Sequence, residues 1–380
     1  MPASRCQRRE IHRFRRTRTF SLAAWKTDPM IIASRSRSAP LCRTLLLILA
    51  MGLTEPGVAR AQTQGPPAQS VRVAGALYMA DLPTLVAESK ELFARHGLDA
   101  EVHRDGVDAD NLARLRAGEV DFALMSLAPL VLDLIADPDP GGPEDPVILA
   151  GLIHSTDING IVFHRNRAIN APSDLSGRQV ALPPGTNAEF LWWLFSTFHG
   201  LPPDVRLLDE HAGDAIPALL AAGTIDAAVV REPWIARLRA QFGDELGQFP
   251  VDQLYTAKWV LVTSRRTARE RRDLCTAMLA TYREAIAVIN EHRGDTLAFY
   301  AERMGVPATV LQDNGPRRAL DYELSLDWSL MAALQQQADW AAAHQAPANP
   351  NIDVIDLIEG SILRALVPGT GGIPPVTHIP

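Results

Sequence analysis

The sequence predicts an α/β fold of two lobes, with mostly parallel sheets and a two-strand hinge. Short apolar runs typical of buried strands alternate with amphipathic helical runs through the body of the chain. The pattern of residues 71–136, which contains the strand motif AGEVDFAL, returns in residues 174–230 with AAGTIDAAVV. Two matching strand–helix–strand halves indicate two lobes that face one another across a cleft.

Each half is predicted to alternate strands and helices, with ends marked by glycine, proline or a polar loop. In the first half we expect strands at 71–77, 98–103, 121–125 and 147–154, and helices at 82–96, 110–117 and 129–136. In the second half we expect strands at 160–164, 178–182 and 225–230, and helices at 187–199 and 216–222. The chain then returns through a strand at 259–263, one long helix at 267–292, shorter helices to residue 343 and a last segment at 352–367.

The same pattern divides the chain into segments. The short polar stretch 155–159 separates the two halves and is the expected hinge. We expect a leader at 1–61, a flexible spacer at 62–70, a first lobe at 71–157 and 257–345, a second lobe at 158–256, and a strap and tail at 346–380.

The leader has the composition of a cleavable secretory signal. Basic residues precede the apolar run 45–53, Pro56-Gly57 breaks it, and the small-residue pattern Ala59-Arg60-Ala61 follows. The apolar run is too short for a spanning helix, which needs about 20 residues. We therefore expect export to the periplasm with cleavage near Ala61-Gln62, and an uncleaved anchor is the alternative.

The composition of the body argues against several classes of function. Acidic residues outnumber basic ones after the leader and no dense basic patch is present, so nucleic acid is not an expected partner. Cys275 is the one cysteine after the leader, and its apolar neighbours predict a buried thiol. The ten histidines have no metal-ligand spacing, and no G-x-S-x-G elbow is present. We therefore expect no metal, no cofactor and no nucleophilic catalysis.

Six motifs carry a resemblance to a known group: GALYMADLP, LFARHGLDAEV, LRAGEVDFAL, APSDLSGRQVALPPGTNAEFLWWL, LLAAGTIDAAVVREPW and LDYELSLDWSLMAALQQQADWA. Over residues 71–345 the chain resembles the substrate-binding proteins of ABC importers for nitrate, sulfonates, taurine and thiamine-pyrimidine precursors. The resemblance implies a type II periplasmic-binding fold, a small molecule held between the lobes, and delivery to an ABC permease and ATPase. We also expect a monomer that meets the membrane only through the permease.

Two other functions remain open from the sequence. A two-lobed binding protein can serve a membrane signalling partner instead of a permease, although no kinase or cyclase segment follows the lobes. The resemblance also extends in outline to pyrimidine synthases on the same scaffold, which require a cysteine-rich iron-binding run and a Schiff-base lysine. That run is absent from this sequence, so we expect a binding protein and not an enzyme.

The candidate ligand contacts follow from the position of strand ends. In open α/β sheets, ligands lie beyond the carboxyl ends of the strands, where helices begin. The residues expected there are Tyr78, Asp81, Ser126, Gly185, Thr186, Asn187, Glu189, Glu232 and Trp234, joined by Thr156 and Asp157 at the hinge and Lys258 on the return strand. Helix capping or core packing is the structural alternative for each of them.

The charge of the ligand stays open at this stage. Ser126 and Thr186 lie at helix N-termini, whose free N–H groups favour an anionic or carbonyl oxygen. The carboxylates of Asp157, Glu189 and Glu232 favour instead a neutral or cationic heteroaromatic that stacks on Tyr78 or Trp234. The sequence weighs slightly toward this second class of ligand.

Overall fold

The computed structural model describes residues 67–75, 79–156, 158–202, 204–209, 215–252, 254–305, 320–344 and 353–369. The predicted leader and the candidate contacts Tyr78 and Asp157 lie outside these residues, as do most of the spacer and the last residues of the tail. Within the described ranges, no helix combines the length and the apolar composition that a membrane crossing requires.

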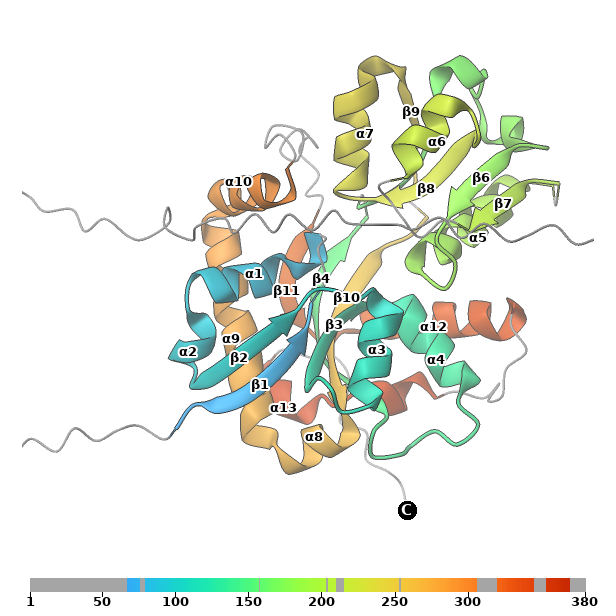
Figure 1. The fold of residues 1–380 in the computed structure, drawn as a ribbon. Helices are drawn as coiled ribbons and strands as arrows, with labels where there is room; N and C mark the ends of the chain where they lie inside the picture. The colour runs from blue at the N-terminus through green and yellow to red at the C-terminus, as the bar shows by residue number, and fades with distance from the viewer. Residues whose placement is uncertain are drawn as a thin grey trace, which may run out of the picture. The chain divides into compact units, whose positions relative to one another are not determined.

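The first sheet has six strands among the described residues, in the order β11-β4-β10-β3-β1-β2 (Figure 1). The strands are β1 (Gln69–Ala74), β2 (Leu98–His103), β3 (Phe122–Ser126), β4 (Pro146–Ser155), β10 (Ala257–Ser264) and β11 (Asp321–Ser325). Strand β1 pairs in parallel with β2 and β3, whereas β10 pairs antiparallel with β3 and β4, and β11 antiparallel with β4. We call this sheet and its helices the first lobe.

Helices of the first lobe form two packed groups. One group surrounds α9 and comprises α1 (Leu82–Ser89), α2 (Leu92–Arg95), α8 (Arg265–Glu270), α9 (Arg272–Glu291), α10 (Arg293–Met304) and α13 (Ser361–Leu366). The other surrounds α4 and comprises α3 (Asp108–Arg116), α4 (Leu127–Ala136) and α12 (Trp328–His344). Short 3₁₀ turns at Met79–Asp81 and Val354–Leu357 complete the lobe.

The second sheet has five strands among the described residues, in the order β7-β6-β8-β5-β9. The strands are β5 (Asn159–His164), β6 (Gln179–Leu182), β7 (Arg206–Asp209), β8 (Ala227–Arg231) and β9 (Leu246–Phe249). In the described part of this lobe, three α-helices accompany them: α5 (Asn187–His199), α6 (Ile216–Ala222) and α7 (Trp234–Phe242). We call this sheet and its helices the second lobe.

In the described residues the chain passes between the sheets from β4 to β5 and again from β9 to β10 (Figure 1). We call these two connections between the sheets the crossing. Ser126, the last residue of β3, pairs with Trp259 near the start of β10. Arg231, the last residue of β8, pairs with Asn159, the first residue of β5. The carboxyl ends of β3 and β8 therefore face the crossing, and the helices that follow them begin there. The predicted two-lobed α/β fold with a two-strand connection is confirmed.

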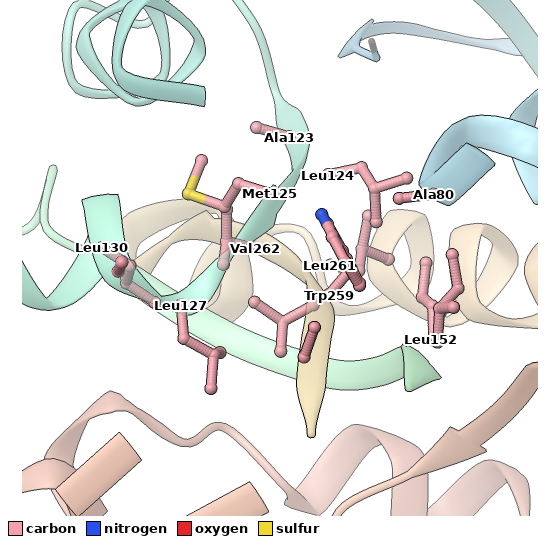
Figure 2. Close-up of a cluster of buried hydrophobic side chains, with 14 of the residues drawn as sticks. Ala80, Ala123, Leu124, Met125, Leu127, Leu130, Leu152, Trp259, Leu261 and Val262 are labelled. Carbon is pink, nitrogen blue, oxygen red and sulfur yellow. The ribbon is translucent and has the colours of Figure 1, made fainter. Parts of the chain in front are cut away.

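The core of the first lobe forms around the return strand. Figure 2 shows Trp259, Leu261 and Val262 of β10 among Leu124 and Met125 of β3 and Leu152 of β4. Trp259 is only 2% exposed, and burial of a large apolar side chain is worth roughly 1.5–3 kcal/mol. The strand that returns from the second lobe is thus held firmly inside the first one.

Most strands of each sheet run in one direction, as predicted, but the sheets are mixed. Among the described residues, four of the nine strand pairings are parallel and five are antiparallel. The cause is the crossing itself. A strand that arrives from the other lobe enters its sheet at the edge where the parallel strands end, so β5 and β10 run against their neighbours.

Two helices predicted as continuous are interrupted. The predicted helix 82–96 breaks because Glu91 adopts a left-handed backbone with φ 56°, and the new direction buries Leu92 and Phe93 near α9. The predicted helix 267–292 breaks at Arg271, which leaves helical geometry and donates hydrogen bonds to Asp121 Oδ1 at 3.0 Å and to the Ser70 carbonyl at 3.3 Å. In both cases a tertiary contact overrides the helical pattern.

Candidate functional site

A cavity of about 150 Å³ lies between the two lobes, at the ends of the strands that face the crossing. The first lobe lines it with Val107, Asp108, Ala109 and Pro129. The second lobe lines it with Asn159, Pro183, Pro184, Gly185, Thr186, Ala188, Ile216, Val229, Val230, Arg231 and Trp234. Valine, proline, isoleucine and tryptophan make most of the wall apolar, and a few polar groups interrupt it.

Within the described part of the chain, every helix that lines the cavity does so with its first turn or its N-cap. Helix α3 contributes Val107 to Ala109, α4 Pro129, α5 Thr186 and Ala188, α6 Ile216 and α7 Trp234. The N-terminus of a helix carries partial positive charge and N–H groups without a helical acceptor. The helix ends of both lobes therefore direct positive potential at one small space, a usual arrangement for anion binding.

Ser126 acts on the cavity through Asp108. Both its backbone N–H and its hydroxyl donate to Asp108 Oδ2, at 2.9 and 2.6 Å. Ser126 is 4% exposed and Asp108 is 8% exposed, so these hydrogen bonds are shielded from water. The carboxylate of Asp108 is thus fixed at the start of α3, where it lines the cavity.

The loop before α5 supplies one wall of the cavity. Gly185 has φ +69°, a conformation that glycine adopts without strain, and its N–H donates to Glu189 Oε2 at 2.7 Å. The Thr186 hydroxyl donates to the Pro183 carbonyl at 2.7 Å and accepts from the Ala188 N–H at 3.2 Å. Glu189 and Thr186 therefore shape the loop, and Glu189 itself does not line the cavity.

Asn187 is buried next to the cavity without lining it. It is 4% exposed, and neither atom of its amide group has a hydrogen-bond partner among the described residues. It shares a helical face with Phe190, whose ring contacts Trp340 of the first lobe at 5.3 Å between centroids. An unsatisfied buried amide costs roughly 1–3 kcal/mol, so this position is energetically unfavourable in the arrangement described.

Arg231 and Trp234 form the charged wall of the cavity. The guanidinium carbon of Arg231 lies 5.3 Å from the centroid of the Trp234 ring, within the range of a cation–π contact. Glu232 lies between them in the chain, and its carboxylate accepts from the Ala236 N–H at 3.0 Å inside the first turn of α7. Glu232 is 1% exposed and serves the start of that helix.

Three predicted contacts lie outside the lining of the cavity. Lys258 donates to Ser329 Oγ at 2.9 Å, and burial lowers the pKa of its ammonium, an effect that Asp327 and Glu323 partly offset. Asp81 is fully buried in the first lobe and forms an ion pair with Arg104 at 2.6 Å. Thr156 is half-buried at the crossing.

The structure thus brings Gly185, Thr186 and Trp234 together in the wall, with Ser126, Asn187, Glu189 and Glu232 directly behind or beside it. Sequence reasoning missed Asp108, Asn159 and the start of α6, and it counted Arg231 only as a nearby cation. The rule of strand carboxyl ends applies equally to β2 and β7. Applied to the predicted strand 98–103, it would have identified the start of α3, whereas the start of α6 follows β7, a strand that the sequence analysis did not predict.

Tyr300 adds a buried hydroxyl near the charged wall. Its side chain is 0% exposed, and the hydroxyl has no hydrogen-bond partner among the described residues. Burial raises the pKa of this phenol well above its ordinary value, and Asp81, Glu232 and Arg231 lie close enough to act on it electrostatically.

Other chemically active side chains lie away from the cavity. Cys275 on α9 is 0% exposed, and burial raises the pKa of its thiol to about 12. A thiol with this pKa is protonated near neutral pH and is a poor nucleophile. In the described ranges, no cluster of three histidine, cysteine or acidic side chains is arranged to hold a metal ion.

The chain matches known proteins in sequence and in fold. The model of the family described as NMT1/THI5 like matches residues 80–294. A protein of Escherichia coli (strain K12), assigned in its name to aliphatic sulfonate binding, is 26% identical over 180 residues, which are 47% of this chain and 56% of that protein. The match therefore spans little more than half the length of this curated relative.

Solved structures show the same fold at low sequence identity. The alkanesulfonate-binding protein of Xanthomonas axonopodis pv. citri bound to MOPS superposes with a TM-score of 0.64 at 18% identity, over 77% of this chain and 99% of that one. A desulfurization enzyme superposes with a TM-score of 0.57 at 15% identity, over 78% of this chain and 98% of that one. The chain belongs to the NMT1/THI5-like family and has the two-lobed fold of the periplasmic binding proteins.

Proposed function

We propose that the protein is an extracytoplasmic solute-binding protein that captures a small organic anion between its lobes and delivers it to an ABC importer. The main support for this proposal is that helix N-termini from both lobes converge on one cavity whose wall includes Arg231. Because each lobe supplies part of this positive environment, an anion binds best when the lobes are together. We therefore expect the lobes to close around the bound anion and to hold it between them.

Two of the three carboxylates that favoured a neutral or cationic ligand, Glu189 and Glu232, have structural roles. Glu189 accepts from the Gly185 N–H, and Glu232 accepts from the Ala236 N–H. Asp108 does line the cavity, but Ser126 donates to it twice and its own helix N-terminus offsets part of its charge. Arg231 and the helix ends supply positive potential at the wall, so we propose an anion in place of the neutral or cationic heteroaromatic expected from the sequence.

The apolar wall argues for an organic anion over an inorganic one. Ile216, Val229 and Trp234 offer no hydrogen bonds and are complementary to a short hydrocarbon body. A cavity of about this volume accommodates benzene in another protein, which sets the scale of the body. The names of the sulfonate-binding relatives agree with this chemistry, since an alkanesulfonate combines an anionic head with an apolar chain.

The cellular role rests on the leader and the family. The leader has the pattern of a cleavable secretory signal with processing near Ala61-Gln62, which supports a periplasmic location. The names of two similar structures, which refer to an ABC-type import system and a sulfonate ABC transporter, support an ABC permease and ATPase as partners. We propose that the protein acts as a monomer. A membrane signalling partner is the alternative recipient of the bound solute.

A catalytic role on the same fold is the second candidate, and the likeness to a desulfurization enzyme is the observation that favours it. The residues of this chain support it less. Cys275 is buried away from the cavity, and Lys258 is bonded to Ser329 outside the wall. The mature protein is therefore proposed to release its ligand unchanged.

A thermal-shift screen of residues 62–380 tests the proposal. Short alkanesulfonates, nitrate, pyrimidines and aromatic amines are compared at increasing concentration, because stabilisation grows with the ratio of ligand concentration to Kd. We expect stabilisation by the alkanesulfonates, and recovery of the unchanged sulfonate by mass spectrometry after incubation. Stabilisation by the amines alone would contradict the anion site, and loss of the sulfonate group would favour the enzyme.

A further inference from the structure

Among the described residues, two of the contacts between the lobes lie on opposite faces of the first sheet. One connects α5 of the second lobe with α12 and the β9–β10 crossing. The other connects α7 of the second lobe with the end of α10. Helix α12 packs with α4 and helix α10 packs with α9, and Figure 1 shows α10 and α12 on opposite sides of β4 and β10. The cavity lies between the two contacts.

The first contact is an aromatic block formed by Phe190, Trp193, Tyr255 and Trp340. The Phe190 ring meets Tyr255 at 5.3 Å and 76° and Trp340 at 5.3 Å and 64°, both in edge-to-face geometry. Phe190, Tyr255 and Trp340 are 0%, 7% and 3% exposed. Buried edge-to-face pairs combine apolar burial with a favourable ring geometry, so the aromatic block resists separation.

The aromatic block also adjoins the crossing itself. Tyr255 lies in the segment that leads from β9 to β10, and its hydroxyl accepts from Gln337 Nε2 of α12 at 3.4 Å. Trp193 extends the contact to the C-terminal end of α12, where its ring meets His344 at 5.5 Å. A point fixed beside a crossing strand moves little when the lobes rotate about that strand.

The second contact is a hydrogen bond from the Arg237 guanidinium to the Met304 carbonyl, at 2.9 Å. Both residues are half-buried, and Met304 is the last residue of α10. The C-terminal end of a helix carries partial negative charge, which attracts the cation. Water competes with such a contact as soon as the lobes begin to part, whereas it cannot replace the packing of the aromatic block.

We propose that the lobes open asymmetrically, with the aromatic block as a pivot and the Arg237–Met304 contact as a polar latch. The cleft then opens between α7 and α10, beside Arg231 and Trp234, and solute enters on that side. This inference rests on the proposed function in that the moving cleft is the proposed binding site. Its test needs no solute, so the two proposals can fail separately.

Spin-label distance measurements on the ligand-free protein test the latch and the pivot. In residues 62–380 with Cys275→Ala, which leaves no native cysteine, one pair of labelled cysteines replaces Gln241 and Glu302 on the latch side. Another pair replaces Thr197 and Ala343 on the pivot side, and all four positions are exposed. Arg237→Gln removes the latch. Arg239→Gln is the matched control, because Arg239 on the same helix donates within the second lobe to Gln248 at 2.7 Å.

We expect Arg237→Gln to lengthen and broaden the latch-side distances by several ångström while the pivot-side distances stay as in the wild type. Arg239→Gln should leave both distributions unchanged, and the free energy of unfolding should be similar in all three proteins. Phe190→Leu should instead disturb the pivot-side distances. Equal latch-side distributions in Arg237→Gln and the wild type would overturn the latch. Joint movement of both pairs would overturn the pivot.

Discussion

The Arg231 guanidinium lies over the Trp234 indole, 5.3 Å from the centroid of the ring. This stacking holds the cation at the wall of the interlobe cavity beside the ends of β5 and β8. A guanidinium fixed on an aromatic face keeps its N–H donors in one plane, which suits the oxygens of a sulfonate or carboxylate. In the function we propose, the pair contacts both the head and the body of an organic anion.

Replacement of Arg231 tests this recognition. We expect Arg231→Gln to weaken binding of an alkanesulfonate roughly tenfold to a hundredfold, because a hydrogen bond to a charged group is worth about 1.5–3 kcal/mol. Titration calorimetry measures the change. Arg239→Gln serves as the control, since Arg239 bonds within the second lobe and does not line the cavity. Equal losses in both variants would assign the effect to general charge and not to the site.

Replacement of Asn187 by an apolar residue should raise the stability of the protein. Asn187→Leu keeps the approximate volume and removes a buried amide whose two atoms have no partner among the described residues. We expect the free energy of unfolding to rise by about 1–3 kcal/mol in urea titrations of the ligand-free protein. Asn187→Asp is the comparison that keeps a polar group at this position. A fall in stability in Asn187→Leu would show that the amide is satisfied in solution.

Removal of the Ser126 hydroxyl should loosen the first-lobe wall. Ser126→Ala deletes the 2.6 Å hydrogen bond to Asp108 and leaves the backbone hydrogen bond in place. We expect a loss of roughly 1.5–3 kcal/mol in the free energy of unfolding, together with weaker ligand binding. Ser329→Ala, which removes a hydroxyl bonded to Lys258 outside the cavity, should leave ligand affinity unchanged.

Asp81 should make stability depend on pH. Burial raises the pKa of its carboxyl to about 6, and the ion pair with Arg104 offsets only part of this shift. The folded protein therefore binds a proton more tightly than the unfolded chain does. The resulting stabilisation is present in full below the ordinary pKa, near pH 4, and is lost as the pH rises through about 6.

The comparison of wild type with Asp81→Asn isolates this contribution, because asparagine does not titrate. In urea titrations between pH 4 and 7, we expect the free energy of unfolding of the wild type to decline relative to that of the variant, by an amount on the order of 3 kcal/mol. Parallel profiles for the two proteins would show that Asp81 keeps its ordinary pKa when folded.

The order of strands and helices could be predicted from the sequence wherever a single local pattern decided it. Helix α5 and strand β2 have the predicted bounds because Thr186 caps the helix and Gly97, at φ +74°, turns the chain into the strand. Strand β11 was missed, although Tyr322 and Leu324 alternate with polar residues in the manner of a half-buried strand. Its pairing with β4, more than 150 residues earlier, is a long-range contact that the local pattern does not contain.

The site could be predicted in position but only partly in chemistry. Strand carboxyl ends located Thr186 and Trp234 correctly in the wall. The direction in which a carboxylate points could not be predicted in this way, because it depends on competition between the ligand and nearby backbone N–H groups. Glu189 and Glu232 both turn to their own helix starts, which local sequence does not reveal. The hydrogen bond from Lys258 to Ser329 could not be predicted either, because Ser329 is distant in the chain.

A matched pair of ligands tests the proposed anion site most directly. Propanesulfonate and propyltrimethylammonium share a short hydrocarbon body and differ in the sign of their charge, and each is titrated calorimetrically into residues 62–380. Saturable binding of propanesulfonate, weakened by Arg231→Gln, with none of the ammonium compound, is the result we predict. Saturable binding of the ammonium compound alone would contradict a cavity built from helix N-termini and Arg231.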